Sequence, residues 1–151
     1  MCSEDEPMET ATIERVLAEA RIENLFDTWD DERGLKSPEL IRSVVIPDAV
    51  VDLQVTLLGL PLCQINELGL IKTATKRGWM ANGIADINVY DPVRLTIQGR
   101  DCVVEVTEFP DGYSAIIGQV PVRLLDFVID RRIHKLIGDP EHGSEQLLDM
   151  F

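Results

Sequence analysis

From residue 44 onward, apolar and polar residues alternate in short runs that are separated by turn residues. Residues 93–98 show the pattern well, because Val93, Leu95 and Ile97 alternate with polar neighbours. Alternation with a period of two is typical of half-buried strands, and many short strands with frequent turns are typical of small barrels and sandwiches. The pattern therefore predicts an all-β fold with one or two short helices.

Several of the predicted strands are joined as hairpins. Residues 73–80 and 84–90 are linked by Ala81-Asn82-Gly83, and Asn-Gly is a strong signal for a tight hairpin turn. A second hairpin is expected to join residues 93–98 and 102–107, with its turn at Gly99-Arg100. The other predicted strands span residues 44–46, 49–51, 114–117, 127–129 and 135–137.

The helical signals are shorter. Pro61 is a good first residue for a helix over residues 61–68, and Gly69 is a good stop. Single helical turns are expected after Ser37-Pro38 and over residues 121–125. Residues 12–29 fit both helical and strand spacing, so the sequence leaves that segment open, and residues 30–34 are predicted to form an exposed loop.

Composition narrows the range of partners. The 151 residues include 27 acidic and 14 basic side chains, which gives a net charge of −13. Nucleic acids and anionic membranes attract basic surfaces, so the sequence predicts neither as a partner. Residues 1–11 are predicted to be an acidic, disordered tail, and residues 12–151 a single domain.

The potential ligand residues do not form a cofactor or metal motif. Three cysteines, an odd number without paired spacing, favour free thiols and a cytoplasmic location. Cys63 and Cys102 occupy apolar positions typical of core thiols, and His134 and His142 are expected at the surface. We therefore expect no cofactor and no bound metal.

One acidic residue lies inside a strongly apolar stretch. Asp52 follows Val50-Val51 and precedes further apolar residues up to position 58. Isolated acids are rarely buried unless they are paired or hydrogen-bonded. Asp52 is therefore either a turn residue at the end of a strand or a functional acid with a perturbed pKa.

The residues around Asp52 belong to a longer series of recognisable blocks. In order along the chain these blocks are residues 20–25, 48–52, 60–61, 68–70, 81–83, 116–121, 126–130 and 135–138. Together they resemble the bacterial branch of the retropepsin-like aspartic proteases, over most of the chain. The resemblance implies a single-lobe, closed acid-protease barrel that forms a homodimer.

The resemblance also implies an activity, the hydrolysis of peptide bonds in a peptide or protein substrate. Each chain would supply Asp52, and two carboxylates that close share one proton, so that one activates a water while the other acts as an acid. The resemblance implies a flap that covers the substrate, formed by Trp79, Met80, Ala81, Asn82 and Gly83. It also implies that Ile117 and Gly118 support the catalytic loop from behind.

The catalytic loop departs from the family motif. The family has Asp-Thr-Gly or Asp-Ser-Gly, and this chain has Asp52-Leu53-Gln54, followed by Val55. Leu53 lacks the hydroxyl that braces the two loops in the family, and Gln54 is expected to disturb the backbone donor that glycine supplies. Three hypotheses stay open: an active endopeptidase, a catalytically silent peptide-binding relative, and a structural module in which Asp52 caps a turn.

Overall fold

The computed structural model describes residues 15–148, and about half of these residues form strands. The strands are β1 (Leu17–Asn24), β2 (Ser43–Val51), β3 (Leu58–Pro61), β4 (Lys72–Met80), β5 (Gly83–Ile97), β6 (Arg100–Phe109), β7 (Ile116–Ile117), β8 (Phe127–Asp130) and β9 (Lys135–Gly138). The α-helices are α1 (Leu25–Glu32), α2 (Leu62–Glu67) and α3 (Gln119–Leu124), and two 3₁₀ turns are η1 (Pro38–Leu40) and η2 (Pro140–His142). The mostly β fold is confirmed, with three α-helices in the described residues instead of one or two.

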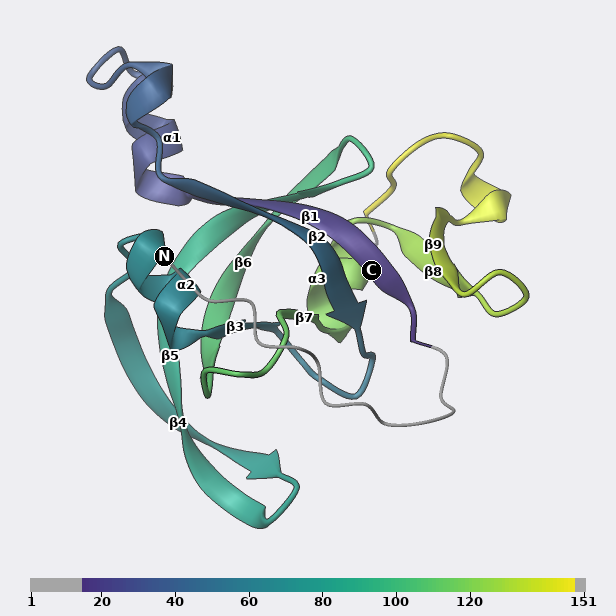
Figure 1. Ribbon diagram of the computed structural model, residues 1–151. Coiled ribbons are helices and arrows are strands. Elements are labelled where there is room, and N and C mark those ends of the chain that lie inside the picture. Colours follow the sequence, from purple (N-terminus) through teal and green to yellow (C-terminus); the bar gives the residue numbers. More distant parts are fainter. Residues whose placement is uncertain (1–14, 149–151) are drawn as a thin grey trace.

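Six of the strands pair in a closed cycle. The order is β1, β2, β7, β3, β6 and β5, and β5 pairs again with β1. Among the described residues, strand β4 pairs only with β5 and so lies outside the cycle, while β8 and β9 form a separate two-stranded sheet (Figure 1). Within the seven-stranded sheet, β4 is therefore the strand with a free edge.

The two-residue strand β7 lies between β2 and β3. Its Ile117 is in register with Val51 at the end of β2, where the strands are parallel, and with Leu58 at the start of β3, where they are antiparallel. The chain leaves β2 at Val51 and enters β3 at Leu58. The intervening loop, residues 52–57, consequently lies directly beside β7.

Residues 12–29, which the sequence left open, contain a strand followed by a helix in their described part. The inward-facing positions of β1 alternate as the strand pattern predicted, and they are Ala18, Ala20 and Ile22. The Asn24 side chain then accepts a hydrogen bond from the Asp27 N–H and caps α1. The predicted loop at residues 30–34 is wrong in its first half, because α1 continues to Glu32.

Two runs that were predicted as separate strands are one long strand, β5. The strand bends at Asp91-Pro92, where its register with β6 shifts. The Asp91 carboxylate accepts the Ile71 N–H at 3.0 Å, and the Asp91 N–H donates to the Ile71 carbonyl at the same distance. These two bonds hold the bend closed, so that the proline interrupts the ladder without ending the strand.

Strand β2 likewise joins two runs that were predicted as separate strands. Residues 44–46 and 49–51 belong to one strand, and Pro47-Asp48 lies where the register with β1 is irregular. The turn between β5 and β6 is formed by Gln98 and Gly99, both with positive φ. The predicted turn at Gly99-Arg100 is therefore displaced by one residue.

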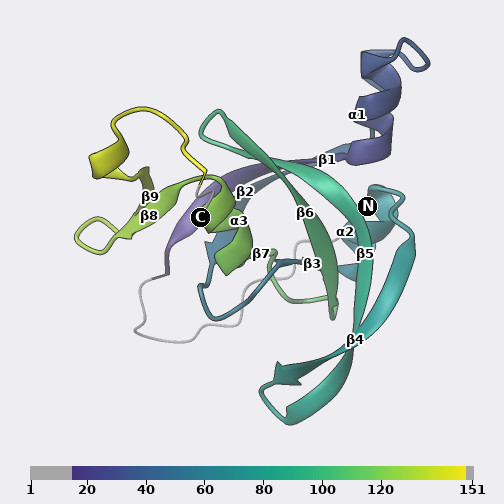
Figure 2. The same cartoon turned by 180° about the vertical axis from the view of Figure 1, so that it is seen from behind.

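The core fills the interior of the strand cycle. Its fully buried members come from most of the strands and from the helices that cover the ends of the cycle, and they include Ile22, Leu58, Leu60, Ile65, Leu68, Val93, Leu95, Ile97, Val106, Ile117 and Leu125. Helices α2 and α3 lie toward opposite ends of the strand cycle (Figures 1 and 2). This core fixes the strand ends that carry the loop at residues 52–57.

The hairpin formed by β4 and the first half of β5 extends well beyond the core (Figures 1 and 2). Its two-residue turn is Ala81-Asn82, and Gly83 follows with φ +113°, so the predicted hairpin is confirmed. At its base, the Glu108 carboxylate accepts bonds from the Tyr90 hydroxyl at 2.6 Å and the Asn88 amide at 3.2 Å. The hydrogen bond to Glu108 and burial raise the pKa of Tyr90 to about 12. The Tyr90 hydroxyl therefore stays protonated at neutral pH and keeps its hydrogen bond to Glu108.

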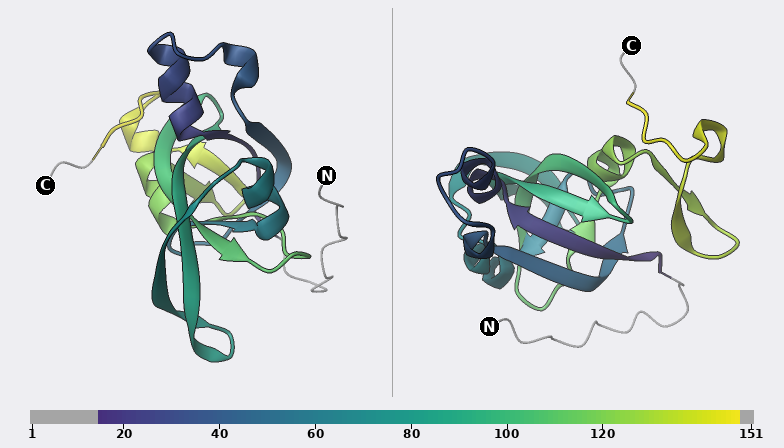
Figure 3. Two further views of the ribbon diagram at one scale, coloured as in Figure 1. Left: turned by 90° about the vertical axis from the view of Figure 1, so that its left-hand side faces the viewer. Right: turned by 90° about the horizontal axis from the view of Figure 1, so that it is seen from above.

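The small β8–β9 sheet lies to one side of the strand cycle (Figure 3). The Arg100 guanidinium at the start of β6 donates to the carbonyl of Leu125 at 3.0 Å and to that of Asp126 at 2.8 Å, and it lies 4.9 Å from the ring centre of Phe127. One cation thus attaches the second sheet to the first. Among residues 15–148, no helix is long and apolar enough to cross a membrane.

The cysteines differ from one another. Cys102 is a free thiol, and burial raises its pKa to about 12, so it is unreactive. Cys63 is half-buried and disulfide-bonded, so the expectation of a free thiol is wrong at that position. Cys2 lies outside the described residues, as does all of the tail predicted at residues 1–11.

Candidate functional site

The candidate site is the tight turn that follows β2. The Val55 N–H donates to the Asp52 carbonyl at 3.1 Å, and the Gln54 N–H donates to the Asp52 carboxylate oxygen Oδ1 at 2.9 Å. The Asp52 side chain is half-buried, whereas Leu53 and Gln54 are exposed. The turn therefore holds the carboxylate at the surface through one of its oxygens.

The turn is attached from behind by β7 and the start of α3. The Asp52 N–H donates to the Ile117 carbonyl at 3.0 Å. Three consecutive N–H groups, those of residues 118–120, then donate to the carbonyls of residues 57, 55 and 56 at 3.0, 2.7 and 2.9 Å. Four backbone bonds therefore fix the loop, and the structure brings Asp52 and Val55 together with Ile117 and Gly118.

This close approach depends on Gly118. A Cβ at that position would contact the carbonyl oxygen of Leu57 and would lie 2.5 Å from that of Val55, where real Cβ atoms keep more than about 3 Å. The φ of Gly118 is −88°, an ordinary value, so the reason for glycine here is space and not backbone strain. Gly118 lets α3 begin in direct contact with the candidate loop.

The structure corrects one expectation about Gln54. Its N–H does donate to the Asp52 carboxylate, so the expected disturbance of the donor is wrong. Among the described non-glycine residues, only Gln98, Asp126 and His134 have positive φ, so Gln54 makes this bond in an ordinary backbone conformation.

The tip of the β4–β5 hairpin stands apart from this loop. Trp79 is 81% exposed, Met80 is 44% exposed, and Ala81 and Asn82 are also exposed. No hydrogen bond or ring contact within residues 15–148 joins the tip to the Asp52 turn. The tip and the turn lie toward the same end of the molecule in Figure 1, but the structure does not bring them into contact.

A cavity of about 440 Å³ lies on a different part of the surface. It is open, and its lining comes from β1, the end of β5 and β9, namely Leu17, Ala18, Glu19, Arg21, Thr96, Ile97, Gln98, Lys135 and Leu136. Neither Asp52 nor the hairpin tip contributes to it. We place the candidate chemistry at the Asp52 turn, because the cavity has no carboxylate held by a braced loop.

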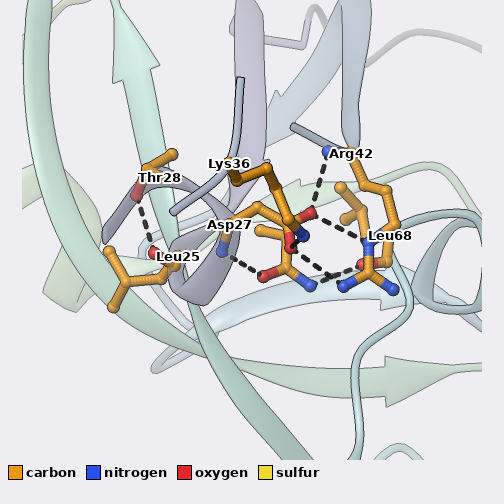
Figure 4. Close-up of polar contacts among 7 residues, drawn as sticks. Leu25, Asp27, Thr28, Lys36, Arg42 and Leu68 are labelled. Atoms are coloured by element: carbon orange, nitrogen blue, oxygen red, sulfur yellow. Dashed lines mark hydrogen bonds and ion pairs between the residues drawn. The ribbon is translucent and has the colours of Figure 1, made fainter. Parts of the chain in front are cut away.

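A second aspartate, which sequence analysis did not select, forms a buried ionic cluster. Asp27 on α1 is 1% exposed and accepts bonds from the Lys36 ammonium at 2.6 Å and from Arg42, whose Nε and Nη2 lie at 2.9 and 3.0 Å (Figure 4). The bonds from Arg42, and then those from Lys36, outweigh burial and hold the pKa of Asp27 far below its usual range. Next to it, the Asn24 amide donates to the Leu68 carbonyl at 2.8 Å.

The Asp27 cluster joins α1 to the start of β2 and to the end of α2. Both carboxylate oxygens of Asp27 are occupied by donors, which leaves no room for a reacting group. The sequence carried only a weak signal for it, because Lys36 and Arg42 are 9 and 15 residues away from Asp27. Its role is structural.

A third group has the residue types of a metal site. The ligand atoms of Asp126, Asp139 and His142 lie within 4.8 Å of one another, and all three residues are half-buried. However, Asp126 Oδ2 already accepts bonds from His142 Nδ1 at 2.7 Å and from the Leu147 N–H at 3.0 Å. These bonds attach the C-terminal segment, and the Asp126 carboxylate raises the pKa of His142. His142 lies at the surface as predicted, with its side chain 30% exposed, but it is also held by Asp126.

The fold and the site define a class: a mostly β, single-lobe protein that presents one half-buried aspartate on a loop braced by a glycine-dependent backbone contact. Comparison of the sequence with models of protein families gives no match, and no curated protein matches it.

Proposed function

We propose that this protein is a single-lobe aspartic endopeptidase that acts as a homodimer and adopts the retropepsin-like barrel. In this proposal Asp52 of one chain faces Asp52 of a second copy across a bound water. Two carboxylates at that distance cannot both be ionised, so they share one proton. The ionised carboxylate takes a proton from the water as the water oxygen bonds to the peptide carbonyl carbon, and the protonated carboxyl donates its proton to the carbonyl oxygen. The C–N bond then breaks as the carbonyl re-forms, and the carboxyl that took the water proton gives it to the leaving amine nitrogen.

The observation that carries the proposal is the state of the Asp52 carboxylate. Oδ1 accepts the Gln54 N–H, while Oδ2 has no hydrogen-bond partner within residues 15–148. The loop behind it is held by four backbone bonds, so the carboxylate is held in place while Oδ2 stays open to a reacting group. A group with a free oxygen on a rigid support suits proton transfer, because catalytic groups need fixed geometry.

The β4–β5 hairpin supports the proposal in a second way. Its tip is exposed on both strands, and Trp79, Met80 and Ile84 give it an apolar end. A peptide bound at the Asp52 turn would be covered if this hairpin closed over it, in the manner of other enzyme lids. In this proposal Ala81, Asn82 and Gly83 form the moving tip.

One observation favours a second function, a catalytically silent module that binds peptides. Leu53 occupies the position of the bracing hydroxyl, and its apolar side chain is 43% exposed. Leu53 cannot donate a hydrogen bond across a dimer interface, so two Asp52 loops would be less firmly held together. Such a protein would retain the Asp52 turn and the hairpin and lack turnover.

The deciding experiment is proteolysis of an unfolded protein substrate at about pH 4 to 6, where a shared-proton dyad is expected to work. The wild-type protein should cleave the substrate, and Asp52→Asn should abolish cleavage. The matched control is Asp48→Asn, an exposed aspartate on the same strand, which should leave the activity unchanged. Cleavage that survives in the Asp52→Asn variant would rule out the proposed mechanism.

A second variant separates the silent module from a purely structural role for Asp52. The double substitution Leu53→Thr with Gln54→Gly restores the family motif. If the wild type is inactive and this variant cleaves in a pH-dependent way, the substrate site and the dimer are intact and the purely structural role is excluded. If neither cleaves and sedimentation shows a monomer, Asp52 only caps the turn.

A further inference from the structure

Strand β4 offers a free edge to an extended chain. Within residues 15–148, this nine-residue strand pairs with β5 on one side only, and nearly all of its side chains are exposed. Unpaired N–H and C=O groups on such an edge readily accept another strand. We use the term hairpin arm for residues 72–88, which include this edge.

The hairpin arm is basic, although the protein is strongly acidic. It carries Lys72, Lys76 and Arg77 and a single acid, Asp86, while the whole chain has a net charge of −13. Within residues 15–148, the three basic side chains are exposed and make no ion pair. Their charge is therefore available to an acidic partner.

The chain supplies such a partner close by. Residues 1–14, outside the described region, contain Glu4, Asp5, Glu6, Glu9 and Glu14 and no Lys or Arg. This segment enters the fold next to the candidate loop, because the Val51 N–H donates to the Val16 carbonyl at 2.9 Å and Leu17 is in register with Val50. The described chain therefore begins beside residues 50 and 51, next to Asp52.

The length of the segment is sufficient. Fourteen extended residues reach at most about 45 to 50 Å, whereas a domain of this size has a radius of gyration of about 15 Å. We propose that the acidic segment 1–14 docks as an extended chain on the basic edge of the hairpin arm of the same molecule. A docked segment runs from the Asp52 turn to the arm, and this docking does not depend on catalysis.

A second copy of the arm is a poorer occupant. Pairing of two β4 edges would bring Lys72, Lys76 and Arg77 of one chain close to the same residues of the other. Like charges placed opposite each other destabilise a strand pair. The acidic segment avoids this repulsion and is present at a high effective concentration because it is covalently attached.

The test uses the full chain and a variant in which the acids of the segment are neutralised, with Glu4→Gln, Asp5→Asn, Glu6→Gln and Glu9→Gln. One exposed ion pair changes an equilibrium constant by up to about fivefold, so loss of two or three should raise amide exchange along the free edge of β4 by about tenfold. Quenching of Trp79 by acrylamide, measured in a Trp29→Phe background, should increase in parallel.

Substitutions on the arm provide the reciprocal test. Lys76→Glu with Arg77→Glu should expose β4 to the same extent, and changing Glu4, Asp5, Glu6 and Glu9 to lysine in that variant should restore protection. The matched control reverses two exposed charges on the other basic hairpin, Arg131→Glu with Lys135→Glu, and should leave β4 unchanged.

Three results would each overturn the proposal. The first is equal exchange and equal Trp79 quenching in the wild type and the neutralised variant. The second is protection of β4 that grows with protein concentration, which would make a second copy the occupant. The third is equal affinity of an added acidic peptide for the wild type and the neutralised variant. A docked segment must compete with the peptide and so weaken its binding to the wild type.

Discussion

Asp27 and Asp52 follow similar apolar pairs, Leu25-Phe26 and Val50-Val51, yet the fold treats them in opposite ways. Asp27 is 1% exposed, with both oxygens bound by Lys36 and Arg42. Asp52 is half-buried, with one oxygen bound by a single N–H. A carboxylate whose oxygens are all occupied stabilises the fold, whereas one with a free oxygen on a rigid loop is available for chemistry.

The largest expected effect comes from removing the buried carboxylate. Asp27→Ala removes the charge-assisted hydrogen bonds from Lys36 and Arg42, whose side chains are 26% and 48% exposed and can regain water. The free energy of unfolding should therefore fall by about 3 kcal/mol. Urea denaturation at pH 7 measures it. Asp30→Ala, on the same helix, is the control and should change stability by less than about 0.5 kcal/mol. Equal effects of the two variants would remove the contrast between Asp27 and a surface acid.

The ionisation of Asp27 gives the second prediction. Its pKa is lowered in the fold, so the unfolded chain binds the proton first as the pH falls below about 4, and stability is lost in that direction. The stabilisation is fully present above pH 4. Between pH 4 and pH 3, this one group should make stability fall by up to about 1.4 kcal/mol more in the wild type than in Asp27→Asn. Parallel pH profiles for the two proteins would contradict the assignment.

The support behind Asp52 is tested next by Gly118→Ala. The added methyl group meets the carbonyl oxygens of Leu57 and Val55 and forces the loop away from α3. Overpacking of this kind costs about 1–3 kcal/mol in the free energy of unfolding. Thermal and urea denaturation measure the change, with the exposed neighbour Gln119→Ala as the control. A neutral Gly118→Ala would show that the contact is dispensable.

The smallest expected effect on stability is that of Asp52→Asn. The asparagine oxygen still accepts the Gln54 N–H, so the free energy of unfolding should change by less than about 1 kcal/mol. Any proteolytic activity should be lost in the same variant. A loss of several kcal/mol would instead mean that Asp52, like Asp27, is chiefly a structural acid, and the contrast would disappear.

Local sequence patterns predicted the hairpins well, since their signals lie within a few residues. The turn at Ala81-Asn82 and the alternation in β1 and β5 follow from local backbone preferences and from one buried face. The patterns failed where a distant contact decides the outcome. Asp91-Pro92 is a typical strand end, but the bonds between Asp91 and Ile71 keep β5 continuous through it.

The candidate site, too, was predicted in part from the sequence and in part depends on the path of the chain. The sequence pattern selected Asp52, because an acid among β-branched residues is unusual, and the family resemblance implied that Ile117 and Gly118 lie behind the loop. Neither could show that the Gln54 N–H still reaches the carboxylate, since that depends on the path of the turn.

The sequence by itself determined the mostly β fold, the hairpins and the position of the unusual acid, because each rests on patterns within about ten residues. Only the tertiary structure decided that Asp27 is paired with two cations and that Asp52 keeps an oxygen without a hydrogen bond. Lys36 and Arg42 reach Asp27 across 9 and 15 residues, and residues 117–120 hold the Asp52 turn from more than sixty residues away. Contacts of that range depend on how the chain packs, which no local pattern records.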